Sequence, residues 1–184
     1  FAKKSGAIVF SNQRNKGLAE TFKTEMKICL ERKADIIVHT DADGQYPASY
    51  IPNLIKEVKN GADLVIGSRF GKGKYSGSIV NGFGNWAFAK VFSNILGIKI
   101  EDTTSGFRAF TPEVARLPLI NSFTYTQEQL IRAGRAKMKI VTIPIKTKKT
   151  RESRLFGNPI HYAVKAWINI LRIYRDFEPL KFFG

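Results

Sequence analysis

The sequence predicts an α/β fold in which a mostly parallel sheet carries helices on both faces. Strand signals alternate with helix signals through the first two-thirds of the 184 residues. Two expected strands, at 35–40 and 62–67, are rich in Ile, Val and Leu, which is typical of strands buried on both faces. Polar residues follow both runs, and in such sheets ligands bind beyond the carboxyl ends of the strands. We therefore expect a functional site at that edge of the sheet.

The expected elements follow from local signals along the chain. Residues 18–30 have the apolar spacing of an amphipathic helix. A second helix has Pro47 just before its start and Gly61 just past its end, which is the usual asymmetry of helix ends. The expected order is a strand at 7–10, a helix at 18–30, a strand at 35–40, a helix at 50–60, a strand at 62–67, a glycine-rich linker at 71–77, helices at 85–96 and 127–136, a strand at 139–146 and an apolar tail at 159–174.

The charge of the chain is its unusual property. Thirty Lys and Arg against fifteen Asp and Glu give a net charge of +15, which indicates an anionic partner such as nucleic acid, an acidic membrane surface or a phosphorylated substrate. Cys29 is the single cysteine, so neither an intramolecular disulfide nor a thiolate metal cluster can form within the chain. No apolar run reaches the ~20 residues that span a bilayer. The chain opens at Phe1 within what reads as a helix-to-strand connection, so we expect an N-terminal strand of the sheet to be missing.

Two carboxylates stand at the centre of the expected site. Asp41 and Asp43 follow the strand at 35–40, and Gln45 offers a third oxygen. Mg²⁺ and Mn²⁺ prefer oxygen ligands of this kind and often share them with substrate phosphates. The alternative is a solvated turn, since Asp and Gly are favoured in turns. Ser68 and Arg69 follow the strand at 62–67, which brings them to the same edge as the carboxylates.

A series of short motifs runs through the chain in a fixed order. The first four are Asn15-Lys16-Gly17, Asp41-Ala42-Asp43-Gly44-Gln45-Tyr46-Pro47, Ile66-Gly67-Ser68-Arg69 and Thr104-Ser105-Gly106-Phe107-Arg108. Later come Tyr125-Thr126-Gln127-Glu128, Ile143-Pro144-Ile145 and Arg151-Glu152-Ser153-Arg154. Together they resemble the family 2 glycosyltransferases, and within that family the dolichyl-phosphate (polyprenyl-phosphate) mannosyl- and glucosyltransferases.

The resemblance implies a type-A glycosyltransferase fold, a Rossmann-like sheet with helices on both faces. It implies that Asp41, Asp43 and Gln45 hold Mg²⁺ or Mn²⁺ with the diphosphate of a nucleotide-sugar, and that Asp41 also contacts the ribose. Asp43 and Arg69 are the expected catalytic residues. Arg108 either orders the site or pairs with a scaffold carboxylate. The expected substrate-binding residues are Lys16, Gly17, Asp41, Ser68, Arg69, Ser105, Arg108, Arg151, Ser153 and Arg154.

Two departures from the family pattern accompany the matches. The family opens with a strand, a proline-containing turn and an acidic pair that bind the nucleotide base, and this chain has none of them. The segment 76–85 also lacks the arginine that usually precedes its helix, which weakens the case for a lipid-phosphate acceptor.

The late part of the chain is strongly basic. Between Arg132 and Arg175 there are twelve Lys or Arg and one acid, Glu152. Such a surface suits an acidic membrane leaflet, and the rings of Trp167 and Tyr174 suit a membrane interface. A core helix that packs on the sheet is an equal alternative for the tail. We divide the chain into a catalytic domain at 1–156 and an amphipathic, membrane-proximal helical tail at 157–184, and expect association with the cytoplasmic face of a membrane.

Three hypotheses of function follow. The first is an inverting, metal-dependent transfer of sugar from a nucleotide-sugar to a lipid phosphate, which is already anionic and needs positioning more than a base. The second keeps the enzyme class but gives it a hydroxyl acceptor, for which Glu128 would be the candidate base; a solvated or capping role suits Glu128 better. The third is a non-enzymatic basic module that binds nucleic acid, which is disfavoured because no nucleic-acid motif appears.

Overall fold

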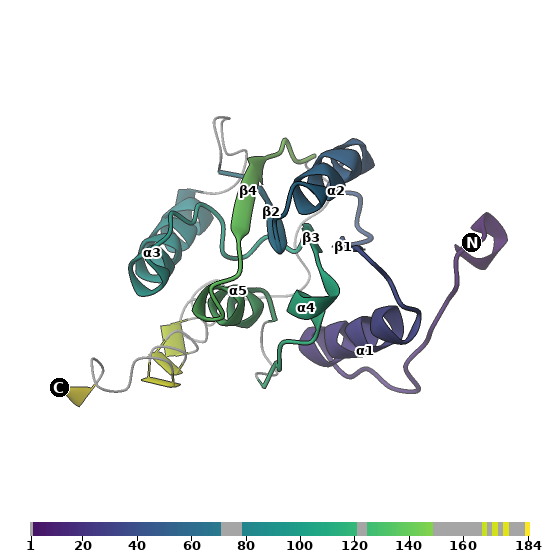
Figure 1. Ribbon diagram of the computed structural model, residues 1–184, viewed down its shortest axis with the longest axis horizontal. Coiled ribbons are helices and arrows are strands. Elements are labelled where there is room, and N and C mark those ends of the chain that lie inside the picture. The colour runs from purple at the N-terminus through teal and green to yellow at the C-terminus, as the bar shows by residue number, and fades with distance from the viewer. Residues whose placement is uncertain are drawn as a thin grey trace.

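The computed structural model describes residues 2–70, 79–120 and 125–148, and in the tail residues 167–168, 171–172, 175–176 and 183–184. For 79–85 and for residue 87 it describes the backbone alone. The elements in chain order are the 3₁₀ turn η1 (Ala2–Ser5), α1 (Leu18–Glu31), β1 (Ile37–His39), the 3₁₀ turn η2 (Ala48–Tyr50), α2 (Ile51–Lys59), β2 (Leu64–Ser68), α3 (Ile79–Leu96), β3 (Arg108–Phe110), α4 (Pro112–Ala115), α5 (Tyr125–Arg135) and β4 (Ile140–Pro144) (Figure 1).

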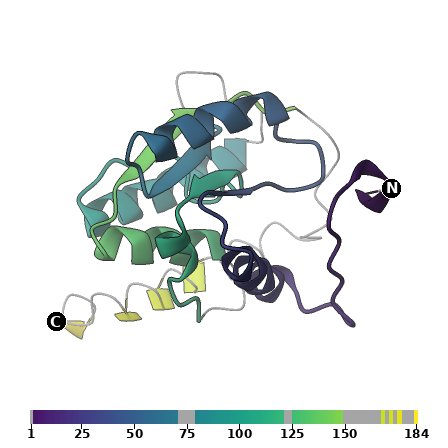
Figure 2. The same ribbon diagram turned by 45° about the vertical axis from the view of Figure 1, so that its right-hand side comes forward.

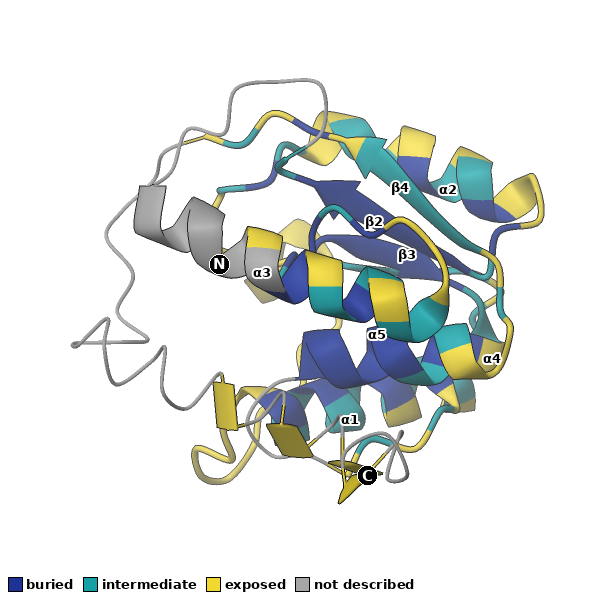
Figure 3. Ribbon diagram, turned by 90° about the vertical axis from the view of Figure 1, so that its left-hand side faces the viewer, coloured by how far each residue is buried: buried dark blue, intermediate teal, exposed yellow. Residues whose placement is uncertain are grey.

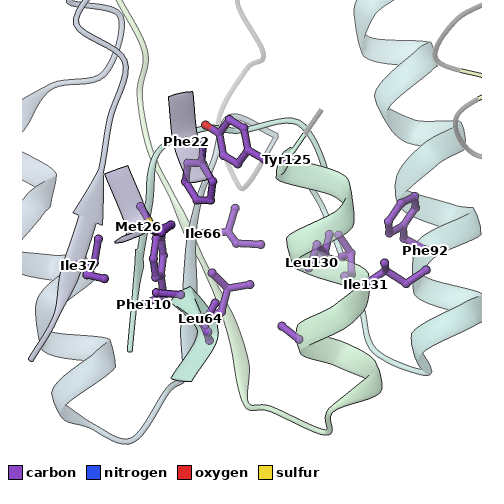
Figure 4. Close-up of a cluster of buried hydrophobic side chains, with 14 of the residues drawn as sticks. Phe22, Met26, Ile37, Leu64, Ile66, Phe92, Phe110, Tyr125, Leu130 and Ile131 are labelled. Atoms are coloured by element: carbon purple, nitrogen blue, oxygen red, sulfur yellow. The ribbon is translucent and has the colours of Figure 1, made fainter. Parts of the chain in front are cut away.

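The described elements form three layers around a four-stranded sheet (Figures 1 and 2). Helix α2 covers one face, where its Leu54 and Val58 pack against Val65 of β2. Helices α1, α3, α4 and α5 cover the other face, and Figure 3 shows the buried residues concentrated between the sheet and these helices. Leu64 and Ile66 belong to this second core, as the two-residue period of a strand requires (Figure 4). The expectation of helices on both faces is therefore confirmed.

The strand order is β1-β3-β2-β4. Strands β2 and β4 pair in parallel, with Leu64 opposite Ile140. Strand β3 lies between β1 and β2 and is antiparallel to both. Strands β1, β2 and β4 therefore share one direction, but the sheet is mixed. The expectation of a mostly parallel sheet needs this correction, because no strand was expected at 108–110.

The reversed direction of β3 has a physical cause. Asp102, six residues before β3, is anchored by its carboxylate to Arg69, which directly follows β2 at the carboxyl end. The chain between 102 and 107 is thus held at that same edge, so the strand that follows must run back across the sheet. The direction of β3 therefore depends on a long-range ion pair rather than on a local apolar pattern.

Most other expected elements are confirmed, with ends that differ by a few residues. The helices expected at 18–30 and 50–60 correspond to α1 and α2, and Gly61 lies in the left-handed region with φ 89° just beyond α2. The helix expected at 85–96 begins earlier, at Ile79. The strand expected at 7–10 is wrong: these residues are exposed and irregular, because no described segment pairs with them. A missing N-terminal strand stays a prediction.

The expected linker at 71–77 and most of the tail at 157–184 lie outside the described residues. In the part of the chain that is described, no helix combines the length and apolar character needed to cross a membrane.

Candidate active site

The carboxyl ends of β1 and β2 bring the expected site residues to one edge of the sheet. β1 ends at His39 and leads into Asp41, and β2 ends at Ser68 and leads into Arg69. The loop 102–107 lies at the same edge and passes close to Asp41. A Cβ added at Gly106 would stand 3.1 Å from Asp41 Oδ2, so only glycine allows this approach without a shift.

Contacts of residues 43, 45 and 46 fix the turn that carries Asp41 and Asp43. Asp43 Oδ1 accepts the backbone N–H of Gln45 at 2.9 Å, which closes an Asx turn. Tyr46 is buried, and its ring stacks on that of Phe107 with centroids 5.2 Å apart. The carbonyl of Gln45 accepts the N–H of Lys148 at 2.9 Å. The basic segment after β4 therefore starts beside the carboxylates.

Asp41 has an unfavourable environment for its negative charge. Burial raises the pKa of Asp41 above its ordinary value; the charges of His39 and Arg69 lower it in part, and that of Asp43 raises it further. A bound cation would relieve both the desolvation and the repulsion between the two carboxylates. The surroundings of Asp41 are therefore compatible with a bound cation.

The donor set fits Mg²⁺ or Mn²⁺ that is shared with a substrate. Asp41 and Asp43 supply two carboxylates and Gln45 an amide oxygen, all hard oxygen ligands. Within the described ranges no three His, Cys, Asp or Glu side chains converge as a closed metal site. A cation here would thus need further oxygens from water or from phosphates, which is how Mg²⁺ is usually bound in phosphate-handling sites.

Arg69 is held by a buried carboxylate. Its Nε donates to Asp102 Oδ2 at 2.8 Å and its Nη2 to Asp102 Oδ1 at 2.9 Å, and Nη2 also donates to Thr104 Oγ1 at 2.5 Å. The Asp102 side chain is 0% exposed. Burial alone would raise the pKa of Asp102, but the hydrogen bonds and the charge of Arg69 lower it below the ordinary value. Arg69 is therefore a fixed part of the edge, and its catalytic role stays a prediction.

Ser68 and Ser105, two of the expected substrate-binding residues, are fully buried. Ser68 Oγ accepts the N–H of Phe70 at 3.1 Å. Ser105 Oγ donates to the carbonyl of Gly67 at 2.7 Å, which ties the loop 102–107 to β2. Both hydroxyls support the backbone of the site in this structure, and contact of either with substrate stays a prediction.

The buried side chain of Arg108 links the loop 102–107 to α5. It is 0% exposed and donates to four neutral oxygens: the carbonyls of Ser105 (2.8 Å), Thr103 (3.3 Å) and Thr126 (2.7 Å) and the side chain of Gln129 (3.1 Å). Burial lowers the pKa of Arg108 to about 10, so the group remains a cation at neutral pH. Of the two expected roles, these contacts favour the first, because they tie the loop 102–107 to α5.

Sequence reasoning missed His39 and Glu25. Nδ1 of His39 lies 2.8 Å from the carbonyl of Gly106, and Nε2 lies 3.3 Å from Glu25 Oε2 on α1. Burial alone would lower the pKa of His39, but these hydrogen bonds and the charge of Glu25 raise it above the ordinary value. The available signal was a polar residue within an apolar strand, two positions before Asp41.

Comparison with known proteins assigns the family. A sequence model of the family described as "Glycosyl transferase family 2" matches residues 1–116, more than half of the chain. The chain belongs to glycosyl transferase family 2. The mixed sheet with helices on both faces fits the α/β fold that the resemblance implied.

Several relatives of this family 2 chain carry names that refer to polyprenyl phosphates, as the resemblance implied. A dolichyl-phosphate hexose transferase of Haloferax volcanii is 34% identical over 60% of this chain and 49% of its own length. An undecaprenyl-phosphate mannosyltransferase of Micrococcus luteus is 31% identical over 85% of this chain and 66% of its own length. A dolichol-phosphate mannosyltransferase of Pyrococcus furiosus is 32% identical over 83% and 44%. The chain thus spans about half to two-thirds of these relatives.

The remaining expected residues are not joined to the carboxylates by described contacts. Lys16 and Gly17 precede α1 and are exposed, with Gly17 in the left-handed region at φ 79°. Arg151, Ser153 and Arg154 lie outside the described residues. Their roles in this family 2 chain stay predictions.

Glu128, the candidate base for a hydroxyl acceptor, belongs to the scaffold. Its side chain is 4% exposed and receives hydrogen bonds from the N–H of Ile120 at 3.0 Å and from Arg132 Nε at 2.8 Å. It is a buried, paired carboxylate rather than the solvated or capping residue that the sequence favoured, and its oxygens already have partners.

We predict that Arg69→Lys keeps the fold of this family 2 chain but lowers the transfer rate of the complete enzyme by about tenfold or more. A lysine donates from one nitrogen and cannot bind both oxygens of Asp102. Urea unfolding should report a loss of about 1.5–3 kcal/mol for the lost charged hydrogen bond. A normal rate in a destabilised variant would assign Arg69 to the scaffold alone.

Asp102 predicts a specific acid dependence of stability. Because its pKa is lowered in the folded state, its contribution is present above the unfolded pKa of about 3.9 and is lost as the pH falls through the folded pKa. The difference in unfolding free energy between wild type and Asp102→Asn should therefore shrink below about pH 4. A difference that stays constant from pH 6 to acid conditions would contradict this assignment.

Proposed function

We propose that this chain transfers a sugar from a nucleotide-sugar to a polyprenyl (dolichyl) phosphate at a membrane surface, with inversion at the sugar and with the help of Mg²⁺ or Mn²⁺. The carrying observation is the pair Asp41 and Asp43 at the carboxyl edge of β1, held against the loop 102–107. The names of the relatives support the acceptor. Membership of family 2 argues against the alternative of a non-enzymatic nucleic-acid-binding module.

Asp41, Asp43 and Gln45 would hold the cation. Mg²⁺ or Mn²⁺ held there would supply positive charge for the diphosphate leaving group. The chain's own residues set the surroundings: Arg69 and Asp102 fix the edge, and Gly106 lets the backbone of the loop approach Asp41 closely. The diphosphate would bind at this edge of the sheet. The buried guanidinium of Arg108 contacts the loop 102–107 at the same edge.

The acceptor chemistry needs no general base if the acceptor is a phosphate. One oxygen of the lipid phosphate forms a bond to the anomeric carbon while the bond from that carbon to the diphosphate breaks, and a single displacement inverts the carbon. The attacking oxygen is already anionic at neutral pH. A hydroxyl acceptor would instead require a base, and Glu128 is buried and paired with Arg132. This observation favours the phosphate acceptor.

Two surface features support a membrane location, for which we propose the cytoplasmic face. The basic segment begins at Lys146 and Lys148, beside the turn 41–45. The N–H of Lys148 donates a hydrogen bond to the carbonyl of Gln45 in that turn. In the tail, the described Trp167, Ile168 and Leu171 are 48%, 44% and 50% exposed. Exposed apolar side chains next to basic ones are what an anionic interface binds.

We predict that Asp43→Asn abolishes transfer in the complete enzyme and weakens Mn²⁺-dependent binding of the nucleotide-sugar. Removing one charge from a two-carboxylate site costs several kcal/mol of charge stabilisation, which is more than about a hundredfold in rate. Excess EDTA should have the same effect on the wild type. Asp63→Asn is a matched control, because Asp63 lies at the other end of β2, where its carboxylate binds the N–H of Lys139. Full activity of Asp43→Asn, or of the wild type in EDTA, would refute the metal role.

We predict salt-sensitive binding to vesicles that contain anionic lipid. Attraction by basic residues is screened at high salt, whereas apolar insertion persists. Changing Lys148, Lys149, Arg151 and Arg154 together to Gln should weaken sedimentation with such vesicles. The fluorescence of Trp167 should shift to the blue on binding, since its ring is half exposed in the free chain. Equally poor binding to neutral and anionic vesicles at low salt would remove the membrane claim and favour a soluble acceptor.

A further inference from the structure

His39 occupies a position that the proposed chemistry does not yet use. It is the last residue of β1, its side chain is 11% exposed, and it lies two residues before Asp41. Most neighbouring strand positions on this sheet carry apolar side chains. A polar ring at such a place needs hydrogen-bond partners, because an unpaired buried polar group is costly.

Each ring nitrogen of His39 lies near an acceptor oxygen from another element. Nδ1 lies 2.8 Å from the backbone carbonyl of Gly106, and Nε2 lies 3.3 Å from Glu25 Oε2. The two nitrogens thus face the loop 102–107 on one side and α1 on the other, and a proton on Nδ1 is donated to the Gly106 carbonyl. The hydroxyl of Tyr125, from α5, lies 3.3 Å from the same Nδ1.

Aromatic packing fixes the plane of the His39 ring. Phe22 meets it edge-on with centroids 5.1 Å apart, and Tyr125 does so at 5.3 Å. Phe22 and Tyr125 stack on each other at 3.9 Å, and Figure 4 shows the two rings together at the margin of the apolar core. The ring of His39 thus has little freedom to turn away from Gly106.

Gly106 connects His39 to Asp41. Its carbonyl accepts from His39, and the place of its absent Cβ lies 3.1 Å from Asp41 Oδ2 and 3.0 Å from the Tyr125 hydroxyl. The loop 102–107 is held at its start by Arg69 and Asp102, in its middle by the contacts of Ser105 and Arg108, and at Gly106 by His39. Without the contact to His39, Gly106, the residue of the loop that approaches Asp41, would lose the hydrogen bond of its carbonyl.

We propose that His39 is a positioning residue for the transfer reaction: by donating to the Gly106 carbonyl, with Glu25 fixing the opposite side of the ring, it holds the loop 102–107 against Asp41. This inference rests on the proposed function, in which Asp41 binds the metal and diphosphate. It assigns His39 no contact with substrate. Its effect is to keep the carboxylate turn and the loop at one distance from each other.

Two substitutions separate positioning from packing. His39→Asn keeps a nitrogen bonded to Cγ, as Nδ1 is, and so can still donate to Gly106, but it loses the ring. His39→Phe keeps a ring between Phe22 and Tyr125 but loses both ring nitrogens. If His39 acts through the hydrogen bond to Gly106, activity should rank Asn above Phe. The free energy of unfolding in urea should be higher for His39→Phe than for His39→Asn, because apolar packing contributes most of the stability at this buried position.

In the complete enzyme, we expect His39→Phe to lower kcat about tenfold or more, with the KM for the nucleotide-sugar near the wild-type value, since a misplaced centre loses transition-state contacts. His39→Asn should keep more of kcat than His39→Phe. Glu25→Leu should lower kcat by a smaller factor. The matched control Glu31→Leu, on the same helix in an exposed pair with Lys27, should leave kcat unchanged.

Hydrogen–deuterium exchange of the loop 102–107, measured without substrate, gives a readout that does not depend on activity. The loop amides should exchange faster in His39→Phe than in His39→Asn, and at the wild-type rate in Glu31→Leu. The inference would be overturned if His39→Phe had a kcat at least as high as His39→Asn and loop amides that exchanged no faster. Both readouts would then follow stability, and His39 would be a core residue. A wild-type enzyme that transfers nothing to lipid phosphate would count against the proposed function, while the exchange ranking would still decide the role of His39.

Discussion

The ion pair between Arg69 and Asp102 is the interaction on which the rest of the site depends. Asp102 is fully buried, and a buried carboxylate is tolerated only when its hydrogen bonds are complete. Here Oδ2 accepts from Arg69 Nε, and Oδ1 accepts from Arg69 Nη2 and from the N–H groups of Thr104 and Ser105 at 3.0 Å. One carboxylate thereby fixes an arginine after β2, the turn of the loop 102–107 and, through that loop, the start and direction of β3.

The charges around this ion pair complement one another only in part. Arg108 is a buried cation whose four acceptors are neutral oxygens, while Asp41 and Asp43 place two negative charges at the front of the edge. A cation would satisfy the carboxylates, and an anion would be attracted by the excess positive charge behind them. The metal–diphosphate that we propose as the ligand would supply both at once.

Local sequence patterns predicted α1, α2 and β2 because their apolar spacing and their Pro and Gly neighbours act within a few residues. The turn 41–45 could be predicted for the same reason, since the carboxylates lie one residue apart after a strand. The partner of Arg69 could not, because Asp102 is 33 residues away and the pairing exists only in the folded chain. β3 was missed because three residues are too few to show the alternation of apolar and polar side chains that marks a strand. The strand expected at 7–10 is wrong because an apolar run forms a strand only where a neighbouring strand pairs with it. His39 was missed because its proposed role depends on contacts with Gly106 and Glu25, which come from other elements.

The central claim is that this edge passes a sugar to a phosphate oxygen rather than to a hydroxyl. The most direct test gives the complete enzyme a labelled nucleotide-sugar, Mn²⁺ and vesicles that contain either a polyprenyl phosphate or the corresponding polyprenol, which differ only in the phosphate. We expect label in the lipid extract with the polyprenyl phosphate and none above background with the polyprenol. Equal labelling of both lipids, or labelling of the polyprenol alone, would contradict it.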